Sequence, residues 1–490
     1  MFDKDNILTS PREIALDPNA YEPLRIVLED SHKSHWPRLL ITTLICFAFV
    51  LFGGAVIWGW AIPTQSKNPG FWHISLISLL YWIGISQAMV ALSAILRITH
   101  ASWRYPLNRL LDISSLFGLW MPVLLPVLIV ARHEIYSLGM AEHRDDVWDM
   151  SGSIVWDALA VGTAYLAGWM LLYLTSMPDF AMLRDRAAVG TKEKKFYGRV
   201  ASWWTLYVTK FATIGPVHIP TGFGLDRVQW TGADHQWRVL RRAEGVLVVG
   251  ILTSFIGSQT ILGWDFQLAA ARNWDSSIFA PLYTLSSVLG ALALTVLVMT
   301  IANRLLRGRG FFTLIQYDSL GKCMVGFALI WTYFRICDFL TAWYGHIPEE
   351  WMLQQSRTVL FPVLVGLMAL GCSAIPIFGN MTPFFRKKPW ALCTISVFVL
   401  VGVACQRYLD TVPTFAPKYY GTVPLLPTWP TLLVFSSITA MFVLTYLIAG
   451  RYFPLMSWWG TSKERTRTAE RKMGNATVTV MVEDPPLWET

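Results

Sequence analysis

The sequence has few charged side chains for its length. Among 490 residues only 15% are Asp, Glu, Lys or Arg, whereas 54% are hydrophobic, and the mean hydropathy is +0.44. A chain of this composition has too little polar surface for an ordinary soluble domain. The sequence therefore predicts a protein that lies in a lipid bilayer.

The chain also has few cysteines and histidines at positions where they would bind a redox cofactor. All six cysteines lie in apolar runs, and no two have the spacing of a zinc or iron–sulfur motif, so we interpret them as packing residues. The nine histidines fall in loops or at the ends of apolar runs, whereas a haem between membrane helices usually needs histidines inside them. We expect no haem and no iron–sulfur cluster in this chain.

Nucleotide and nucleic-acid signals are weak as well. The segment "TGFG" lacks the flanking strand and helix that a phosphate-binding glycine loop needs. The net charge of +8 comes largely from loop segments such as "TKEKKFYGR" and "SKERTRTAERK". Anionic lipid is the expected counter-charge of such segments, so the lipid membrane is the predicted partner and nucleic acid is not.

Long apolar runs are the main feature that is present. A helix needs about 20 apolar residues to cross a bilayer. Ten runs qualify, near residues 38–60, 72–98, 108–131, 153–176, 241–264, 277–304, 320–345, 357–378, 389–411 and 430–450. The predicted fold class is all-α, a polytopic membrane protein with about ten transmembrane helices. The polar first 37 residues resemble no cleavable signal peptide, so we expect the first span to act as its own signal anchor.

The distribution of Lys and Arg predicts the orientation of these spans. Most of the 40 basic residues lie in the N-terminal segment, in the tail, or in the links after the second, fourth, sixth and eighth spans. By the positive-inside rule, both termini are cytoplasmic. The expected topology is a chain that crosses the membrane many times, with Asp265 on the outer side.

The expected organisation follows from the spans. We predict the following segments: a cytoplasmic N-terminal segment (1–37), a first transmembrane helix (38–71), the second to fifth spans (72–264), the sixth to ninth spans (265–411), a link with the last transmembrane helix (412–450), and a basic cytoplasmic tail (451–490). The long cytoplasmic loop 177–240 mixes aromatic and basic residues with Gly and Pro in "ASWWTLYVTKFATIGPVHIPTGFG". We expect a partly helical segment there, lying in the membrane interface.

Ionisable side chains in or beside the spans are the candidate functional residues, because a charge in lipid is costly. On the outer side, the third span ends with Arg132 and His133, Asp157 opens the fourth span, and Asp265 ends the fifth. The remaining candidates are Arg97, Asp112, Arg335, Asp338, Arg407 and Asp410.

Two charge pairs have helical spacing. The segments "FRICDF" and "QRYLDT" place Arg335 with Asp338 and Arg407 with Asp410, each pair three residues apart and so on one helical face. One interpretation is a self-compensated structural pair in each helix. The other is a proton path with Asp338 as carrier, because it lies nearer mid-span than Asp410. Asp112, near the cytoplasmic side, is a further candidate for this path.

Several longer motifs carry a family resemblance. They are "YWIGISQAMVALSAILR", "SIVWDALAVGTAYLAGWMLLYLTSMPDFAMLRDRA", "ILGWDFQLA" and "GKCMVGFALIWTYFRICDFLTAWYGHIPEE". Between about residues 70 and 380 the chain resembles the NrfD/PsrC (polysulfide reductase-like) integral membrane subunits. It is most similar in character to the ten-helix subunits of alternative complex III.

This resemblance implies a fold and a function. The fold has two four-helix bundles, formed by spans two to five and six to nine, with one peripheral helix outside each. Quinol binds near the periplasmic face of the first bundle, and electrons pass to a periplasmic iron–sulfur (molybdopterin-like) subunit. The implied cofactor is a quinone, menaquinone or ubiquinone. Further implied partners are a multihaem cytochrome and a second NrfD-like membrane subunit, and coupling to proton translocation is an additional hypothesis.

The resemblance also implies roles for individual residues. Asp157 and Asp265 match acidic residues of the quinone pocket, and Arg132 matches the arginine of an "HxGR"-like element. Quinol oxidation releases two protons, so a partly desolvated carboxylate with a raised pKa suits the acceptor. The alternative interpretation is that both carboxylates merely cap or anchor helix ends at the interface.

The chain departs from the family where quinone-binding histidines are often found. Those positions hold Ile129, Gln87, Gln259 and Asp275. His133 follows Ile129 by about one helical turn and is a candidate substitute, although it is equally well interpreted as an interfacial histidine without a task. Two hypotheses therefore stay open: a quinol-oxidising subunit, and a diverged paralogue that serves as membrane anchor or proton-conducting subunit without its own quinone site. A stand-alone transporter is a weaker third.

Overall fold

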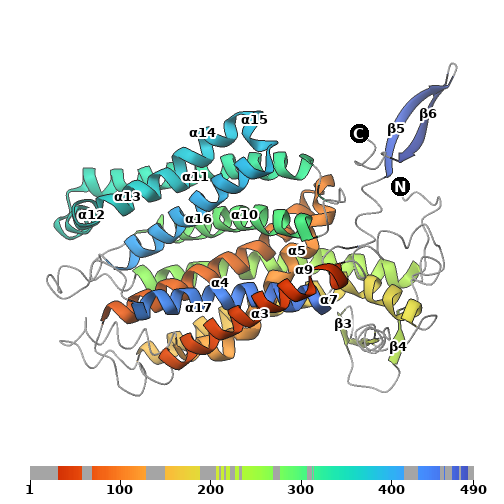
Figure 1. The fold of residues 1–490 in the computed structure, drawn as a ribbon, viewed down its shortest axis with the longest axis horizontal. Helices are drawn as coiled ribbons and strands as arrows, with labels where there is room; N and C mark the ends of the chain where they lie inside the picture. The colour runs from red at the N-terminus through yellow and green to blue at the C-terminus, as the bar shows by residue number, and fades with distance from the viewer. Residues whose placement is uncertain are drawn as a thin grey trace.

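A computed structural model provides the three-dimensional description of this chain. The residues that it describes are 31–57, 69–127, 149–187, 206–208, 211–214, 217–220, 227–230, 234–268, 276–305, 312, 314–412, 429–452, 457, 466–473 and 476–483. Long, roughly parallel helices dominate this part of the chain (Figure 1).

Nine helices among the described residues are long and apolar enough to cross a membrane. They are Trp72–Ile98, Tyr105–Val127, Val155–Ala181, Gln236–Leu268, Phe279–Arg304, Leu314–Gly345, Pro362–Met381, Pro389–Thr411 and Leu432–Gly450. These correspond to the second to tenth predicted spans. The first predicted span is represented by a shorter apolar helix, Ile41–Ile57. The chain is thus a multi-pass helical membrane protein.

The first helix group surrounds α4 and contains the elements up to residue 268. Its members are α4 (Pro69–Ile98), η3 (Ser102–Arg104), α5 (Tyr105–Ile113), η4 (Ser114–Trp120), α7 (Asp149–Ala187), α9 (Asp234–Gly263) and the π-helical turn η7 (Trp264–Leu268). Helix α9 packs against both α7 and α4, while α5 and η4 close the group between α4 and α7.

The second helix group surrounds α10 and α16. Its members are α10 (Phe279–Leu305), α11 (Leu314–Gly345), α12 (Pro348–Leu360), α13 (Pro362–Ala369), the π-helical turn η8 (Leu370–Ala374), α14 (Ile375–Met381), α15 (Pro383–Arg386) and α16 (Pro389–Thr411). Helix α10 packs on α11 and α16, and α13 packs on α16. The turn η8 also packs on α16, and Gly371 and Gly402 allow this contact, because a Cβ on Gly371 would lie 2.4 Å from the carbonyl oxygen of Phe398.

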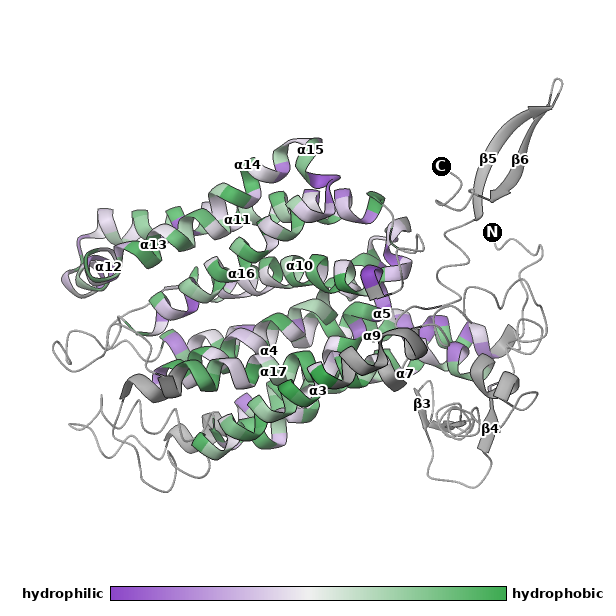
Figure 2. Ribbon diagram, viewed as in Figure 1, coloured by the Kyte–Doolittle hydropathy of each residue, from purple (hydrophilic) through white to green (hydrophobic). Residues whose placement is uncertain are grey.

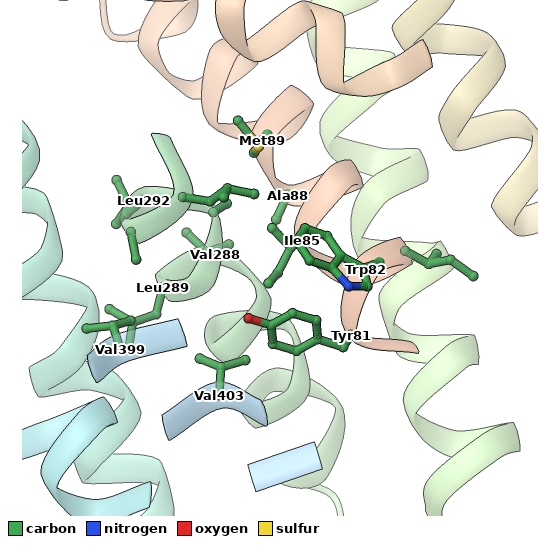
Figure 3. Close-up of a cluster of buried hydrophobic side chains, with 14 of the residues drawn as sticks. Tyr81, Trp82, Ile85, Ala88, Met89, Val288, Leu289, Leu292, Val399 and Val403 are labelled. Carbon is green, nitrogen blue, oxygen red and sulfur yellow. The ribbon is translucent and has the colours of Figure 1, made fainter. Parts of the chain in front are cut away.

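The two helix groups meet along α4, α10 and α16, where the apolar core is densest. Figure 3 shows Tyr81 and Ile85 of α4 facing Val288 of α10 and Val403 of α16. Gly290 keeps this contact close, since a Cβ there would lie 3.0 Å from the Ile85 side chain. The helix groups therefore form one packed body, in which polar side chains near this seam are shielded from lipid.

Helices α3 (Ser31–Gly54) and α17 (Trp429–Tyr452) pack against each other, and α17 also packs on α4 and η4. Two indole N–H groups secure this contact: Nε1 of Trp82 donates to Oγ1 of Thr439 at 3.1 Å, and Nε1 of Trp120 donates to Oγ1 of Thr445 at 2.9 Å. Both peripheral helices thus lie on the α4 side. This differs from the expected arrangement of one peripheral helix outside each bundle, because α17 provides hydroxyl acceptors for tryptophans of the first helix group.

The loop 177–240 contains strands where we expected a partly helical segment. The described parts are β1 (Leu206–Val208), β2 (Phe211–Ile214), β3 (Val217–Pro220) and β4 (Arg227–Gln229), with β1 paired to β4 and β2 to β3, all antiparallel. The expectation of helix is wrong for these residues. Their β-branched and aromatic side chains favour strands, and the prolines interrupt a helix.

The basic tail contains a hairpin of β5 (Thr466–Met473) and β6 (Ala476–Glu483), with Thr466 opposite Glu483. The helical body itself has two distinct ends. Figure 2 shows hydrophilic residues gathered at the end that carries α15 and the start of α9, which we name the basic end. We name the end that carries α12 the far end (Figure 1).

Candidate functional site

The two predicted catalytic carboxylates lie on neighbouring helices at the far end. Asp157 is buried on the first turns of α7, and Asp265 is half-buried in the π-helical turn η7 that ends α9. Helices α7 and α9 pack along their lengths. A π-helical turn is a wide, locally irregular turn that often occurs at functional sites. The side chains of η7, including Asp265, therefore leave the helix in other directions than they would from a regular α-helix.

Apolar side chains border both carboxylates. Val155, Trp156 and Leu159 are exposed beside Asp157, and Trp264 is exposed beside Asp265. In a membrane these exposed side chains face acyl chains. Asp157 itself is only 2% exposed and lies on the inward side of α7, whereas Asp265 is partly exposed, so Asp265 is the acid that a lipid-soluble molecule reaches more directly from the bilayer.

Three predicted site residues, Arg132, His133 and Ile129, lie outside the described residues, as does Asp275. Their roles as quinone ligands or as a substitute general base stay predictions.

The predicted quinone-binding residues Gln87 and Gln259 are brought into direct contact in the interior. Nε2 of Gln259 and Oγ of Ser258 both donate to Oε1 of Gln87, at 2.8 and 2.9 Å, and both glutamines are buried. Oγ of Ser287 donates to Oε1 of Gln259 at 2.9 Å. These amides tie α4, α9 and α10 together, so both glutamines serve as polar links between helices.

Arg407 continues this chain of hydrogen bonds into the second helix group. Its Nη2 donates to Oγ of Ser287 at 2.7 Å and to the carbonyl oxygen of Tyr283 at 3.0 Å. Its guanidinium carbon lies 3.4 Å from the centroid of the Tyr283 ring, which is a cation–π contact. Nε2 of Gln267, two residues beyond Asp265, reaches Oγ1 of Thr411 at 3.0 Å on the same helix, α16.

The predicted pair of Arg407 and Asp410 is therefore wrong. Arg407 points toward α10, whereas Asp410 points toward α11 and α12, where Nη1 of Arg335 lies 3.4 Å from its Oδ1. Because α16 is buried on several faces, each charge finds its partner on a different neighbouring helix. The other predicted pair is confirmed: Nη1 of Arg335 lies 3.6 Å from Oδ2 of Asp338.

Four charged side chains at the far end of the second helix group lie close together, and we name them the far-end charge cluster: Arg335, Asp338, Arg357 and Asp410. Nη2 of Arg357 lies 3.8 Å from Oδ1 of Asp410, and its Nε donates to the carbonyl oxygen of Leu409 at 3.1 Å. The cluster is net neutral but loosely paired.

Polar neighbours complete the surroundings of Asp338. Oγ of Ser276 donates to its Oδ1 at 3.2 Å, and Nε2 of Gln354 donates to its Oδ2 at 3.4 Å. Within the described part of the chain, Oδ2 of Asp410, Nε2 of Gln406 and Nε of Arg407 have no protein hydrogen-bond partner. Buried polar atoms of this kind are usually satisfied by internal water. The segment 406–411 of α16 is consequently the most polar stretch of the buried interior.

Asp112, the remaining predicted proton-path residue, lies in a much tighter arrangement at the basic end. Nη2 of Arg97 lies 2.7 Å from Oδ2 of Asp112, and Nη1 of Arg97 lies 3.0 Å from its Oδ1. Oγ of Ser93 donates to Oδ1 of Asp112 at 2.6 Å, and Nε of Arg97 donates to Oε1 of Glu244 at 2.8 Å. Both oxygens of Asp112 are thus engaged, which favours a structural role.

Several charged residues of these clusters were missed from the sequence. A second buried ion pair at the basic end joins Nη2 of Arg109 to Oδ2 of Asp179 at 2.6 Å. Arg357 was placed at the edge of a span and was not recognised as an interior residue. For Arg109 and Asp179 the available signal was the apolar residues on either side of each charge, whereas the polar residues Gln354 to Ser356 before Arg357 gave no such signal. We name the set of Arg97, Asp112, Glu244, Arg109 and Asp179 the basic-end charge cluster.

No protein-family model and no curated protein matches this chain. The class that the fold defines is nevertheless clear: a multi-pass helical membrane protein with buried ionisable side chains inside its spans. Such side chains are costly in a bilayer and mark functional or structural sites.

Proposed function

We propose that this chain is the integral membrane subunit of a respiratory quinol-oxidising electron-transfer complex of the NrfD/PsrC type. The proposal is supported by one observation above the others: Asp157 and Asp265 lie at the same end of the packed helices α7 and α9, and the residues next to each in sequence include exposed apolar side chains. Quinol oxidation needs a proton acceptor within reach of a hydrophobic, membrane-dissolved substrate. This pair of carboxylates meets that need.

The arrangement of helices supports the same proposal. The first and second helix groups are compatible with two four-helix bundles, although α3 and α17 both lie on the α4 side and not one outside each bundle. In this proposal the far end is periplasmic, both termini are cytoplasmic and the membrane is a bacterial inner membrane. Electrons leave to a periplasmic iron–sulfur subunit, with a multihaem cytochrome and a second NrfD-like subunit as further partners.

The residues around Asp157 and Asp265 fit a quinone. A bound quinone would supply the two-electron, two-proton chemistry. The carboxylates would hold and release protons at their oxygens, while Trp156, Leu159 and Trp264 would contact the apolar tail. The interior at Gln87 and Gln259 is filled by mutual hydrogen bonds, so the head group is expected near the far end.

Substitution of the two carboxylates tests the proposal. In the assembled complex, Asp157→Asn and Asp265→Asn should each lower quinol oxidation by about 10² to 10⁴ in rate, the contribution of one general base. Asp318→Asn is a matched control, since that carboxylate lies at the basic end beside Arg386. If turnover is unchanged in both test variants and the complex still assembles, the two carboxylates are not proton acceptors and serve only to anchor helix ends at the interface.

A second candidate function is a diverged paralogue that acts as membrane anchor or proton-conducting subunit without its own quinone site. It is favoured by the hydrogen bonds of Gln87 and Gln259, which occupy positions where the family often has histidine. The far-end charge cluster would then be its functional element. Extraction of the purified chain distinguishes the candidates: a stoichiometric quinone supports the first, and quinone found solely in a sister subunit supports the second.

A further inference from the structure

The turn between α14 and α16 exposes lysines and aromatic rings at the basic end. It comprises residues 381–390, "MTPFFRKKPW", and includes the short helix α15. Figure 2 shows hydrophilic residues at α15 and at the adjoining end of α11. We name this segment the basic aromatic turn. It connects two spans, Pro362–Met381 and Pro389–Thr411, so it lies at the depth of the lipid head groups.

Arg386 holds the backbone of this turn in place. Its Nε donates to Oδ1 of Asp318 at 2.8 Å, and its Nη1 donates to the carbonyl oxygen of Asn380 at 2.9 Å. Gly321 on α11 makes room for the arginine stem, because a Cβ there would lie 2.9 Å from Cγ of Arg386. Nε and Nη1 of the guanidinium are both bonded inside the protein, so Arg386 is a positioning residue.

Lys387 and Lys388 are differently placed. Lys387 is exposed, and Nζ of Lys388 lies 3.6 Å from the centroid of the Phe384 ring. Neither lysine forms an ion pair with any described residue, whereas the nearby Asp318 is already shared by Arg386 and Lys322. The turn therefore has two cationic groups available for an external anion.

Apolar side chains flank these cations. Phe384 and Trp390 are 58% and 63% exposed, and Phe378 and Met381 at the end of the preceding helix are also exposed. Tryptophan and other aromatic rings favour the boundary between head groups and acyl chains. A ligand that suits this surface has an anionic head and apolar chains in the same molecule.

We propose that the basic aromatic turn binds an anionic phospholipid. The phosphate oxygens accept hydrogen bonds from Lys387 and Lys388, and the acyl chains lie against Phe384 and Trp390. An acidic protein segment fits less well, because Phe378, Met381 and Trp390 belong to the two membrane spans that flank the turn. The site is independent of the proposed quinol chemistry, which lies at the far end.

Lipid retention by the purified full-length chain tests the proposal. Native mass spectrometry would compare added phosphatidylglycerol with phosphatidylcholine. A basic residue near an anionic lipid surface contributes about 1 kcal/mol, or roughly fivefold in affinity. The double variant Lys387→Gln with Lys388→Gln should therefore weaken phosphatidylglycerol retention by about 30-fold at low salt. Phosphatidylcholine retention should stay unchanged.

Two control variants make the outcome decisive. Replacement of both lysines by Arg keeps the charges and should retain phosphatidylglycerol within about twofold of the parent. Arg238→Gln with Arg242→Gln removes the same charge from exposed positions on α9 and should also leave retention unchanged. Equal loss in the α9 variant, or no loss in the lysine variant, overturns the proposal. Loss of a co-purifying protein with lipid retention intact overturns it in favour of an acidic protein partner.

Discussion

The basic-end and far-end charge clusters place the same kinds of side chain in the membrane interior with different geometry. At the basic end, Nη1 and Nη2 of Arg97 both donate hydrogen bonds to the Asp112 carboxylate, and Nη2 of Arg109 lies 2.6 Å from Oδ2 of Asp179. At the far end, the closest approach of an arginine to Asp410 is 3.4 Å. Short, bidentate pairs hold one geometry, whereas longer ones accommodate rearrangement or a change of protonation. The short contacts favour a structural task for the first cluster, and the longer contacts of the second cluster are what the substitutions below test.

The largest expected difference between the two ends is in their labelling from outside the cell. One end should react fully with an impermeant reagent and the other should not react, because they lie on opposite sides of the membrane. In a background without the six native cysteines, a Cys replacing exposed Tyr344 at the far end should react with an impermeant maleimide on whole cells. A Cys replacing Lys387 at the basic end should not. The reverse pattern would invert the orientation and, with it, the proposed periplasmic quinol site.

The next largest effect is expected from breaking the basic-end cluster. Asp112→Ala leaves Arg97 charged and buried with only Glu244, a change that typically costs about 3–5 kcal/mol. The yield of folded protein and the midpoint of thermal unfolding in detergent should both fall. Lys322→Gln breaks an ion pair in which the lysine is exposed and serves as control, with an expected cost of about 0–1 kcal/mol.

A smaller effect is expected from Asp410→Asn at the far end. The carboxylate makes long contacts with Arg335 and Arg357, and Asp338 remains to balance part of their charge. We expect a cost of about 1–3 kcal/mol, measured in the same unfolding assay. A cost equal to that of Asp112→Ala would erase the distinction between the two clusters.

The smallest effect on stability is expected when one charge of each sign is removed together. Arg335→Gln with Asp338→Asn leaves Asp410 paired with Arg357, so the unfolding free energy should change by no more than about 1 kcal/mol. If Asp338 carries protons, this double variant assembles but loses proton movement in reconstituted vesicles. Full retention of proton movement rules out a path through this residue.

Much of the fold was predictable because hydropathy acts locally. The spans from Trp72 onward were found from run length alone, and the pair of Arg335 and Asp338 followed from helical spacing, since both depend on residues close in sequence. The pair of Arg407 and Asp410 had the same spacing but failed. Its two side chains leave α16 in different directions, toward α10 and toward α11 with α12, and spacing holds no information about those neighbours.

The candidate site shows the same division. Sequence reasoning selected Asp157 and Asp265 by their positions at span ends, and it selected Gln87 and Gln259 only as departures from a family pattern. It did not show that the two glutamines bond to each other. It missed Arg357 altogether, because that residue enters the interior from a short helix whose direction depends on how α11 and α13 pack.

The sequence by itself determined that this protein lies in a membrane, which segments cross it and where costly charges occur, because burial in lipid selects for composition and length. Only the tertiary structure decided how those charges are paired, where α3 and α17 pack, and that part of the long loop forms strands. Each of these outcomes depends on contacts between segments far apart in the chain. Such contacts are chosen by the packing of whole helices, and no local pattern encodes them.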